Sequence, residues 1–169
     1  MGIVFSNNLE IKSLEGNLDI GGILRSQPQT VPMFAVGKSN GGNGYVTAGT
    51  IIWNVVVFND GNHFNASTGI FTAPIAGHYW FYVWIMTANN TSNVNRHYTL
   101  RRNNLTTSNN HNDVAYIYSS STTSVHKQFS GGTIFKLEAG DNVRVVYGNG
   151  SLYMASIVYT RFSGVFLGN

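Results

Sequence analysis

The feature that most constrains this fold is a run of residues that is apolar or aromatic on both of its alternating faces. The segment 77–87 contains two interleaved sets: Tyr79, Phe81, Val83 and Ile85, and then Trp80, Tyr82, Trp84 and Met86. Successive side chains of a strand point to opposite faces, and an antiparallel strand on the outside of a sandwich normally presents one polar face to water. Something other than water must therefore cover the second face.

The rest of the chain predicts further short strands. From Val31 onward, apolar runs are separated by Gly, Asn and Pro, and no segment keeps a 3.6-residue period. We expect strands within residues 32–38, 50–58, 63–73, 78–88, 96–103, 113–119, 125–137, 142–148 and 159–167. At 169 residues the chain fits one domain, and this number of strands indicates an all-β sandwich, jelly roll or barrel.

The first thirty residues differ in character from the remainder. They carry three of the seven carboxylates, and glycines at 16, 21 and 22 interrupt the second half of this segment. The apolar residues Val4, Ile11, Leu14 and Leu18 lie near heptad spacing, with Asn7 at the remaining inward position. We divide the chain into an N-terminal leader at 1–30, with a short parallel neck as the alternative, and a globular domain at 31–169.

Charge and cysteine content exclude several classes of protein. The formal net charge is +3 and no basic cluster is longer than Arg101-Arg102, which argues against nucleic-acid binding. The absence of cysteine excludes disulfides, thiolate zinc sites and cysteine nucleophiles. We expect neither a transmembrane segment nor a signal peptide in this sequence, because it contains no run of about 18 apolar residues and no basic N-terminal region followed by an apolar one.

Titratable residues do not converge on a catalytic pattern. The seven carboxylates are scattered, the five histidines have no paired ligand spacing, and no serine lies in a nucleophile elbow. We therefore expect no enzyme activity, no metal site and no cofactor. One stretch, "HNDVAYIY", combines His111, Asn112 and Asp113 with Tyr116 and Tyr118, and it fits either a ligand site or a polar loop that leads into a strand.

An ordered set of aromatic and glycine positions resembles the signature of complement C1q-like globular domains. These positions are Trp53, Asn59, Phe64, Phe71, Gly77, Tyr79 and Phe81, with five, four, six, five, one and one residues between them. Only Trp53 departs from the pattern, because the family usually has Phe there. The segments "MFAVG", "SGGTIFKLEAGDNVRV" and "TRFSGVFL" are similar to the flanking strands, so the resemblance spans about residues 31–168.

The resemblance implies a ten-stranded jelly-roll sandwich of the C1q/tumour-necrosis-factor type that assembles as a homotrimer. On this basis neighbouring subunits would cover the second face of the aromatic strand. We expect Tyr79, Phe81, Tyr147 and Phe162 to contribute to the core or to the subunit contacts.

The resemblance also suggests a possible calcium site, since several C1q-like domains bind this ion through carboxylates near the trimer apex. The corresponding stretches here, "NNTSNVN" and "NGSLYMASIVY", contain no Asp or Glu. Calcium prefers charged oxygen ligands. We therefore do not expect calcium binding of the family type.

Two functions fit these observations. The first is a secreted or particle-surface recognition module of lectin-like or innate-immune type, in which amide and hydroxyl groups of surface loops bind glycans or microbial surface molecules. The second is a structural trimeric head or cap of a fibre, virus or spore; a receptor-binding ligand of the tumour-necrosis-factor kind is a third. For the recognition module, the expected ligand-binding residues are Asn93, Asn95, Arg101, His111, Asn112 and Tyr116.

Overall fold

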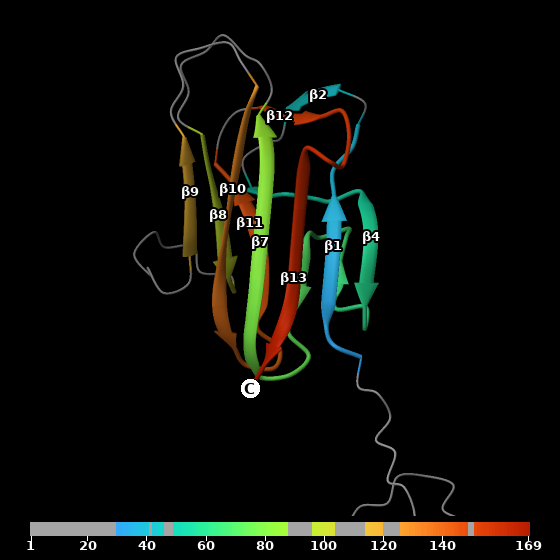
Figure 1. Cartoon of the computed structure of the whole chain (residues 1–169), viewed down its shortest axis with the longest axis vertical. Helices are drawn as coiled ribbons and strands as arrows, with labels where there is room; N and C mark the ends of the chain where they lie inside the picture. The colour runs from blue at the N-terminus through green and yellow to red at the C-terminus, as the bar shows by residue number, and fades with distance from the viewer. Residues whose placement is uncertain are drawn as a thin grey trace, which may run out of the picture.

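Two antiparallel sheets packed face to face make up the protein (Figure 1). The computed structural model describes residues 30–40, 42–45, 49–87, 96–103, 114–119, 126–148 and 151–169. The front sheet contains β1 (Met33–Gly37), β2 (Gly42–Tyr45), β4 (Val55–Asp60), β7 (Gly77–Thr87), β10 (Lys127–Leu137), β12 (Ser151–Met154) and β13 (Thr160–Gly168). The rear sheet contains β3 (Gly49–Thr50), β5 (Phe64–Asn65), β6 (Ile70–Thr72), β8 (Arg96–Arg102), β9 (Val114–Ser119) and β11 (Asn142–Tyr147).

The aromatic strand, β7, is central to the front sheet. It pairs along its whole length with β10 on one side. On the other side it pairs with β13 from His78 to Ile85 and with β12 at Thr87, and β1 and β4 follow β13 outward. The rear sheet has the order β5-β6-β11-β8-β9, with β3 beside the end of β11. The all-β sandwich predicted from the sequence is therefore confirmed, and no helix able to cross a membrane occurs among the described residues.

The number and limits of the strands differ from the sequence prediction. The described residues form thirteen strand segments, whereas the sequence predicted nine ranges and the resemblance implied ten strands. β2 and β3 lack the alternating apolar pattern that marks a strand, and β12 alternates but is only four residues long. The run 63–73 is divided into β5 and β6 by a turn. There the side chain of Asn65 accepts hydrogen bonds from the backbone N–H of Ser67 and Thr68, at 3.0 and 3.3 Å. Gly69 completes this turn with φ +71°, and a Cβ at this position would collide with the carbonyl oxygen of Ile51.

The core lies between the two sheets and is dominated by aromatic rings. Alternate residues of β7 point into it, as the sequence pattern predicts, and the opposite set faces outward. The four residues expected in the core or the subunit contacts are all fully buried within the single chain: Tyr79, Phe81, Tyr147 and Phe162. Tyr79 and Phe81 pack against Phe71, and Phe162 packs against Phe34 and Phe81, in stacked, tilted and edge-to-face contacts. Tyr147 stacks on Tyr98. These four side chains are therefore committed to joining the two sheets.

Candidate assembly face and ligand site

The outward-facing side chains of β7 form a continuous aromatic row. The ring centroids of Trp80 and Tyr82 are 5.6 Å apart, and those of Tyr82 and Trp84 are 6.0 Å apart. Trp84 is held in place by a hydrogen bond of 3.1 Å from its Nε1 to the carbonyl of Val158, and the guanidinium of Arg161 lies 5.6 Å from the centre of its ring. The row is therefore an ordered surface.

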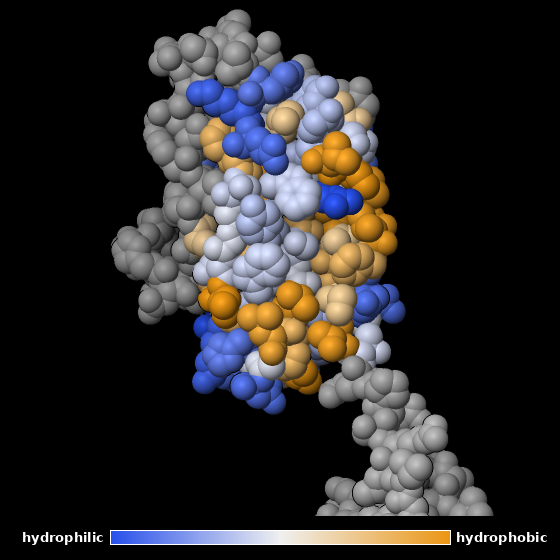
Figure 2. Space-filling model, in the orientation of Figure 1, coloured by the Kyte–Doolittle hydropathy of each residue, from blue (hydrophilic) through white to orange (hydrophobic). Residues whose placement is uncertain are grey.

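Neighbouring strands extend this row into a larger apolar surface. Ile134 on β10 and Val165 on β13 lie opposite Trp80 in register, and we call Trp80, Tyr82, Trp84, Ile134 and Val165 the aromatic face. Trp80 is 42% exposed and Ile134 56% exposed. Figure 2 shows hydrophobic colouring over the lower part of the front sheet and along one side of it. Patches of this kind on a single chain commonly mark contact sites for other molecules.

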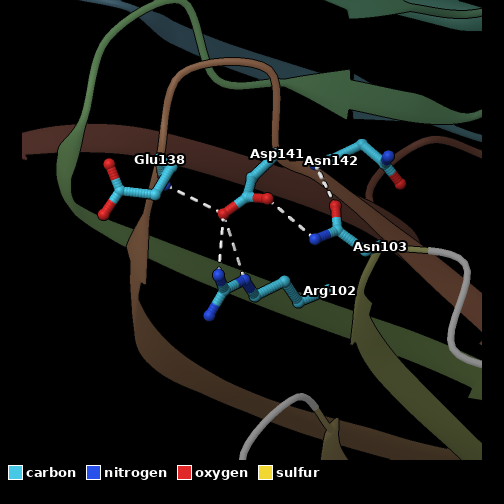
Figure 3. A network of polar contacts seen from close by, with 5 residues as sticks. All are labelled: Arg102, Asn103, Glu138, Asp141 and Asn142. Carbon is cyan, nitrogen blue, oxygen red and sulfur yellow. Dashed lines mark hydrogen bonds and ion pairs between the residues drawn. The ribbon is translucent and has the colours of Figure 1, made fainter.

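A polar network at the other sheet fixes the end of β8 (Figure 3). The carboxylate of Asp141 accepts hydrogen bonds from the Glu138 backbone N–H at 2.9 Å, from Arg102 Nε at 3.1 Å and from Asn103 Nδ2 at 2.7 Å. It also forms an ion pair with Arg102 Nη2 at 2.9 Å. Asn103 in turn exchanges hydrogen bonds with the backbone of Asn142. Hydrogen bonds thus hold Arg102 and Asn103, at the end of β8, to the turn between β10 and β11.

This network changes the acidity of Asp141. Burial acts to raise the pKa of the carboxyl, but the hydrogen bonds from Asn103 and Glu138 and the nearby charge of Arg102 outweigh it and hold the pKa below its usual value. Asp141 therefore remains ionised at neutral pH and neutralises Arg102.

Arg101, one of the predicted ligand residues, is the next-to-last residue of β8. It is partly buried, and its Nε donates a hydrogen bond of 3.1 Å to the hydroxyl of Thr99. Tyr116 belongs to β9 and pairs with Thr99 in register. Arg101 pairs with Val114, which is two residues before Tyr116 on the same strand. The structure thus brings these two predicted residues to one region of the rear sheet.

The other four predicted ligand residues, Asn93, Asn95, His111 and Asn112, lie outside the described residues. The segment with His111 and Asn112 connects β8 to β9 in the sequence and begins directly after Asn103, a residue of the Asp141 network. The segment with Asn93 and Asn95 connects β7 to the start of β8, and the seven residues of β8 separate the two attachment points by roughly 20 Å. The six residues are therefore attached at two ends of the sandwich.

Comparison with known families identifies the domain. A family model described as the C1q domain matches residues 33–167. The chain belongs to the C1q domain family.

Known relatives and solved structures agree with this assignment. The chain is 31% identical over 117 residues to complement C1q tumor necrosis factor-related protein 3 of Mus musculus, a match that covers 69% of this chain and 44% of that relative. The globular domain of zebrafish complement 1qA has a TM-score of 0.63 at 19% identity, covering 82% of this chain and 99% of that chain. Murine APRIL has a TM-score of 0.62 at 16% identity, covering 81% and 99%. The predicted jelly-roll fold of the C1q/tumour-necrosis-factor type is thereby confirmed.

The signature residues of this C1q domain serve the fold. Trp53, Phe64 and Phe71 are buried in the core together with the inward residues of β7. The Asn59 side chain donates a hydrogen bond to the carbonyl of Phe64 at 2.8 Å and accepts one from its N–H at 3.0 Å, which closes the turn between β4 and β5. The residues that reveal the family are therefore different from those available to a ligand.

The described residues offer no metal site of the family type. Within these ranges no three His, Asp or Glu side chains come together. Residues 151–159, which include β12 and the turn that follows it, carry no carboxylate. This donor set does not fit calcium, which prefers charged oxygen ligands.

One residue of the region around Arg101 is not recognisable from the sequence alone. Arg144 of β11 lies directly opposite Arg101 in register, although the two are far apart in the sequence. Arg144 lies in the segment "SGGTIFKLEAGDNVRV", which resembles a family strand but gives no sign of a ligand site, so only the pairing of β8 with β11 reveals its position beside Arg101.

Proposed function

We propose that this C1q domain is a non-enzymatic, homotrimeric recognition module that acts outside the cell or on a particle surface. The observation that carries the proposal is the aromatic face. It lies on the outside of a sheet whose inner side chains are already committed to the core. Two further copies of the chain would remove this face from water, and membership of the C1q domain family supports a symmetric assembly of this kind.

The ligand, a glycan or a microbial surface molecule, would bind through the loops. Arg101 and Tyr116 lie in a region that the Asp141 network anchors, and His111 and Asn112 belong to the segment that starts there. Loops on a rigid scaffold are the usual carriers of binding residues. Each site would be weak, and three sites on one trimer would raise the effective affinity by about 10² to 10⁴ where the ligand is multivalent.

Light scattering tests the assembly. We expect a trimer for the parent chain and dissociation for Trp80→Ser combined with Ile134→Ser, because polar groups at the aromatic face remove the apolar area that the subunits would share. Ile52→Ser is the control, since Ile52 is also exposed, at 41%, and lies outside the aromatic face. A parent chain that stays monomeric and soluble at micromolar concentration would contradict the proposal.

Single alanine substitutions of Arg101, His111 and Tyr116 test the ligand site. We expect unchanged melting temperatures and reduced binding to a multivalent glycan surface. If binding survives all three substitutions, the site has been assigned to the wrong residues. If the parent trimer binds neither glycan nor microbial surfaces, the structural head or cap replaces the recognition module.

A further inference from the structure

Two arginines face each other on the outer surface of the rear sheet. Arg101 of β8 and Arg144 of β11 are direct partners in the antiparallel register. Directly opposite residues of such a pair have Cβ atoms about 5 Å apart, and like charges in this position destabilise a sheet. A negatively charged group close to both arginines would therefore stabilise the pair.

The described residues supply neutral partners only. Arg101 donates to the Thr99 hydroxyl at 3.1 Å, and Arg144 Nη2 donates to Asn142 Oδ1 at 2.7 Å. The Nε of Arg144 is buried and forms no hydrogen bond within the described structure. Both guanidinium groups are thus oriented by the sheet while retaining donor capacity.

The carboxylate nearest to Arg144 along the chain is already in use. Asp141, three residues before Arg144, accepts hydrogen bonds from Arg102, Asn103 and the Glu138 N–H, and its charge is balanced by Arg102. Arg102 and Arg101 are adjacent in sequence, yet of these two only Arg102 has a carboxylate partner among the described residues. Burial, and then the nearby positive charge of Arg101, lowers the pKa of Arg144. Within the part of the chain that the structure describes, the two arginines therefore have no carboxylate that balances their charge.

We propose that Arg101 and Arg144 form a binding site for an oxyanion, a sulfate or carboxylate group carried on a glycan. The inference rests on the proposed recognition function and names the chemical class of its ligand. Guanidinium groups bind planar or tetrahedral oxyanions through parallel charged hydrogen bonds, so one such group satisfies the free donors and offsets the repulsion between the arginines.

The surroundings favour a glycan over an anionic membrane. Thr72 is an exposed neutral residue of β6, which pairs with β11, and Asn65 is an exposed neutral residue of β5, the next strand outward. Thr72 lies opposite Asn142 in register, on the side of Arg144 away from β8. Hydroxyl and amide groups of this kind suit the neutral part of a sugar chain. Recognition of anionic lipid surfaces instead uses clusters of about four to eight basic residues, whereas this site has two.

Binding to four surfaces tests the ligand class: heparin for sulfate, polysialic acid for carboxylate, dextran as a neutral polymer, and vesicles rich in phosphatidylserine. We expect the parent trimer to bind heparin or polysialic acid at least about tenfold more tightly than dextran. Arg101→Gln and Arg144→Gln should each weaken this binding by about tenfold or more, because each removes charged hydrogen bonds to the oxyanion. Lys136→Gln removes one charge from an exposed position of the front sheet and should change binding less than about twofold.

Thermal melting in sodium sulfate, against sodium chloride of equal ionic strength, tests the oxyanion site without any glycan. Sulfate stabilises proteins generally, so the informative quantity is the difference between variants. We expect a larger gain in melting temperature for the parent and Lys136→Gln than for the double variant Arg101→Gln/Arg144→Gln.

The two experiments separate the failure of this inference from that of the proposed function. Equal binding to dextran and heparin, or unchanged binding in both arginine variants, would overturn the oxyanion site while leaving recognition in place. Binding to the vesicles alone would overturn the glycan assignment. If no polymer binds but sulfate stabilises only the proteins that keep both arginines, the oxyanion site stands and glycan recognition is rejected. An equal sulfate effect in the double variant overturns the site.

Discussion

Removal of the Asp141 carboxylate should be among the most destabilising polar substitutions in this domain. Three donors converge on it, from Arg102, Asn103 and the Glu138 N–H, and its side chain is only 14% exposed. Hydrogen bonds to a charged group each contribute about 1.5–3 kcal/mol, and they are not additive. We therefore expect Asp141→Ala to lower the free energy of unfolding by about 3 kcal/mol, which corresponds to roughly 6–12 °C in melting temperature for a domain of this size.

Urea unfolding at a series of pH values checks both the size and the origin of this effect. The folded-state pKa of Asp141 is lowered from its ordinary value of 3.8, so its contribution is fully present above that value. It is lost as the pH falls through the lower folded-state pKa. The difference between the parent and Asp141→Ala should therefore be largest at neutral pH and should narrow in strongly acidic solution.

Asp60→Ala is the matched control, because Asp60 is an exposed carboxylate of β4. Exposed substitutions of this type usually change stability by less than about 0.5 kcal/mol. If Asp141→Ala costs no more than the control at neutral pH, or if its cost does not depend on pH, the carboxylate does not anchor the end of β8 in the way described.

Two further predictions concern the core and metal ions. Gly164→Val should destabilise the domain by about 1–3 kcal/mol in urea unfolding, because a Cβ there would lie 2.6 Å from the ring of Phe34 and 2.7 Å from that of Phe81; an unchanged midpoint would show that the rings move aside easily. A chelator should leave the melting temperature of the parent almost unchanged, since the described residues lack a carboxylate cluster. A fall of more than about ten degrees would show that amide and carbonyl oxygens hold a stabilising cation.

Much of the fold could be predicted from local patterns. The period-2 alternation of residues 77–87 predicted which side chains of β7 enter the core, and the spacing from Trp53 to Phe81 predicted the family. The short strands β2, β3 and β12 could not be predicted in this way. β2 and β3 contain few apolar side chains, and β12 is only four residues long. All three pair with neighbouring strands through backbone hydrogen bonds, which leave no trace in the local sequence.

The candidate site was predictable only in part. Arg101 and Tyr116 were chosen for their residue types, and the structure places them near one another on β8 and β9. The placement of Asn93 and Asn95 in a segment attached at the other end of β8 depends on the direction of the strands. Neither composition nor motif contains this information.

By itself, the sequence determined the class of the fold, the family and the presence of an aromatic surface larger than one core can bury. These properties depend on the alternation of side chains along a strand, which is a local property of the chain. The tertiary structure alone places Arg144 opposite Arg101, and it alone pairs Asp141 with Arg102 and not with Arg101 or Arg144. Such pairs depend on the register between strands distant in sequence, and that register is selected by the packing of the whole core.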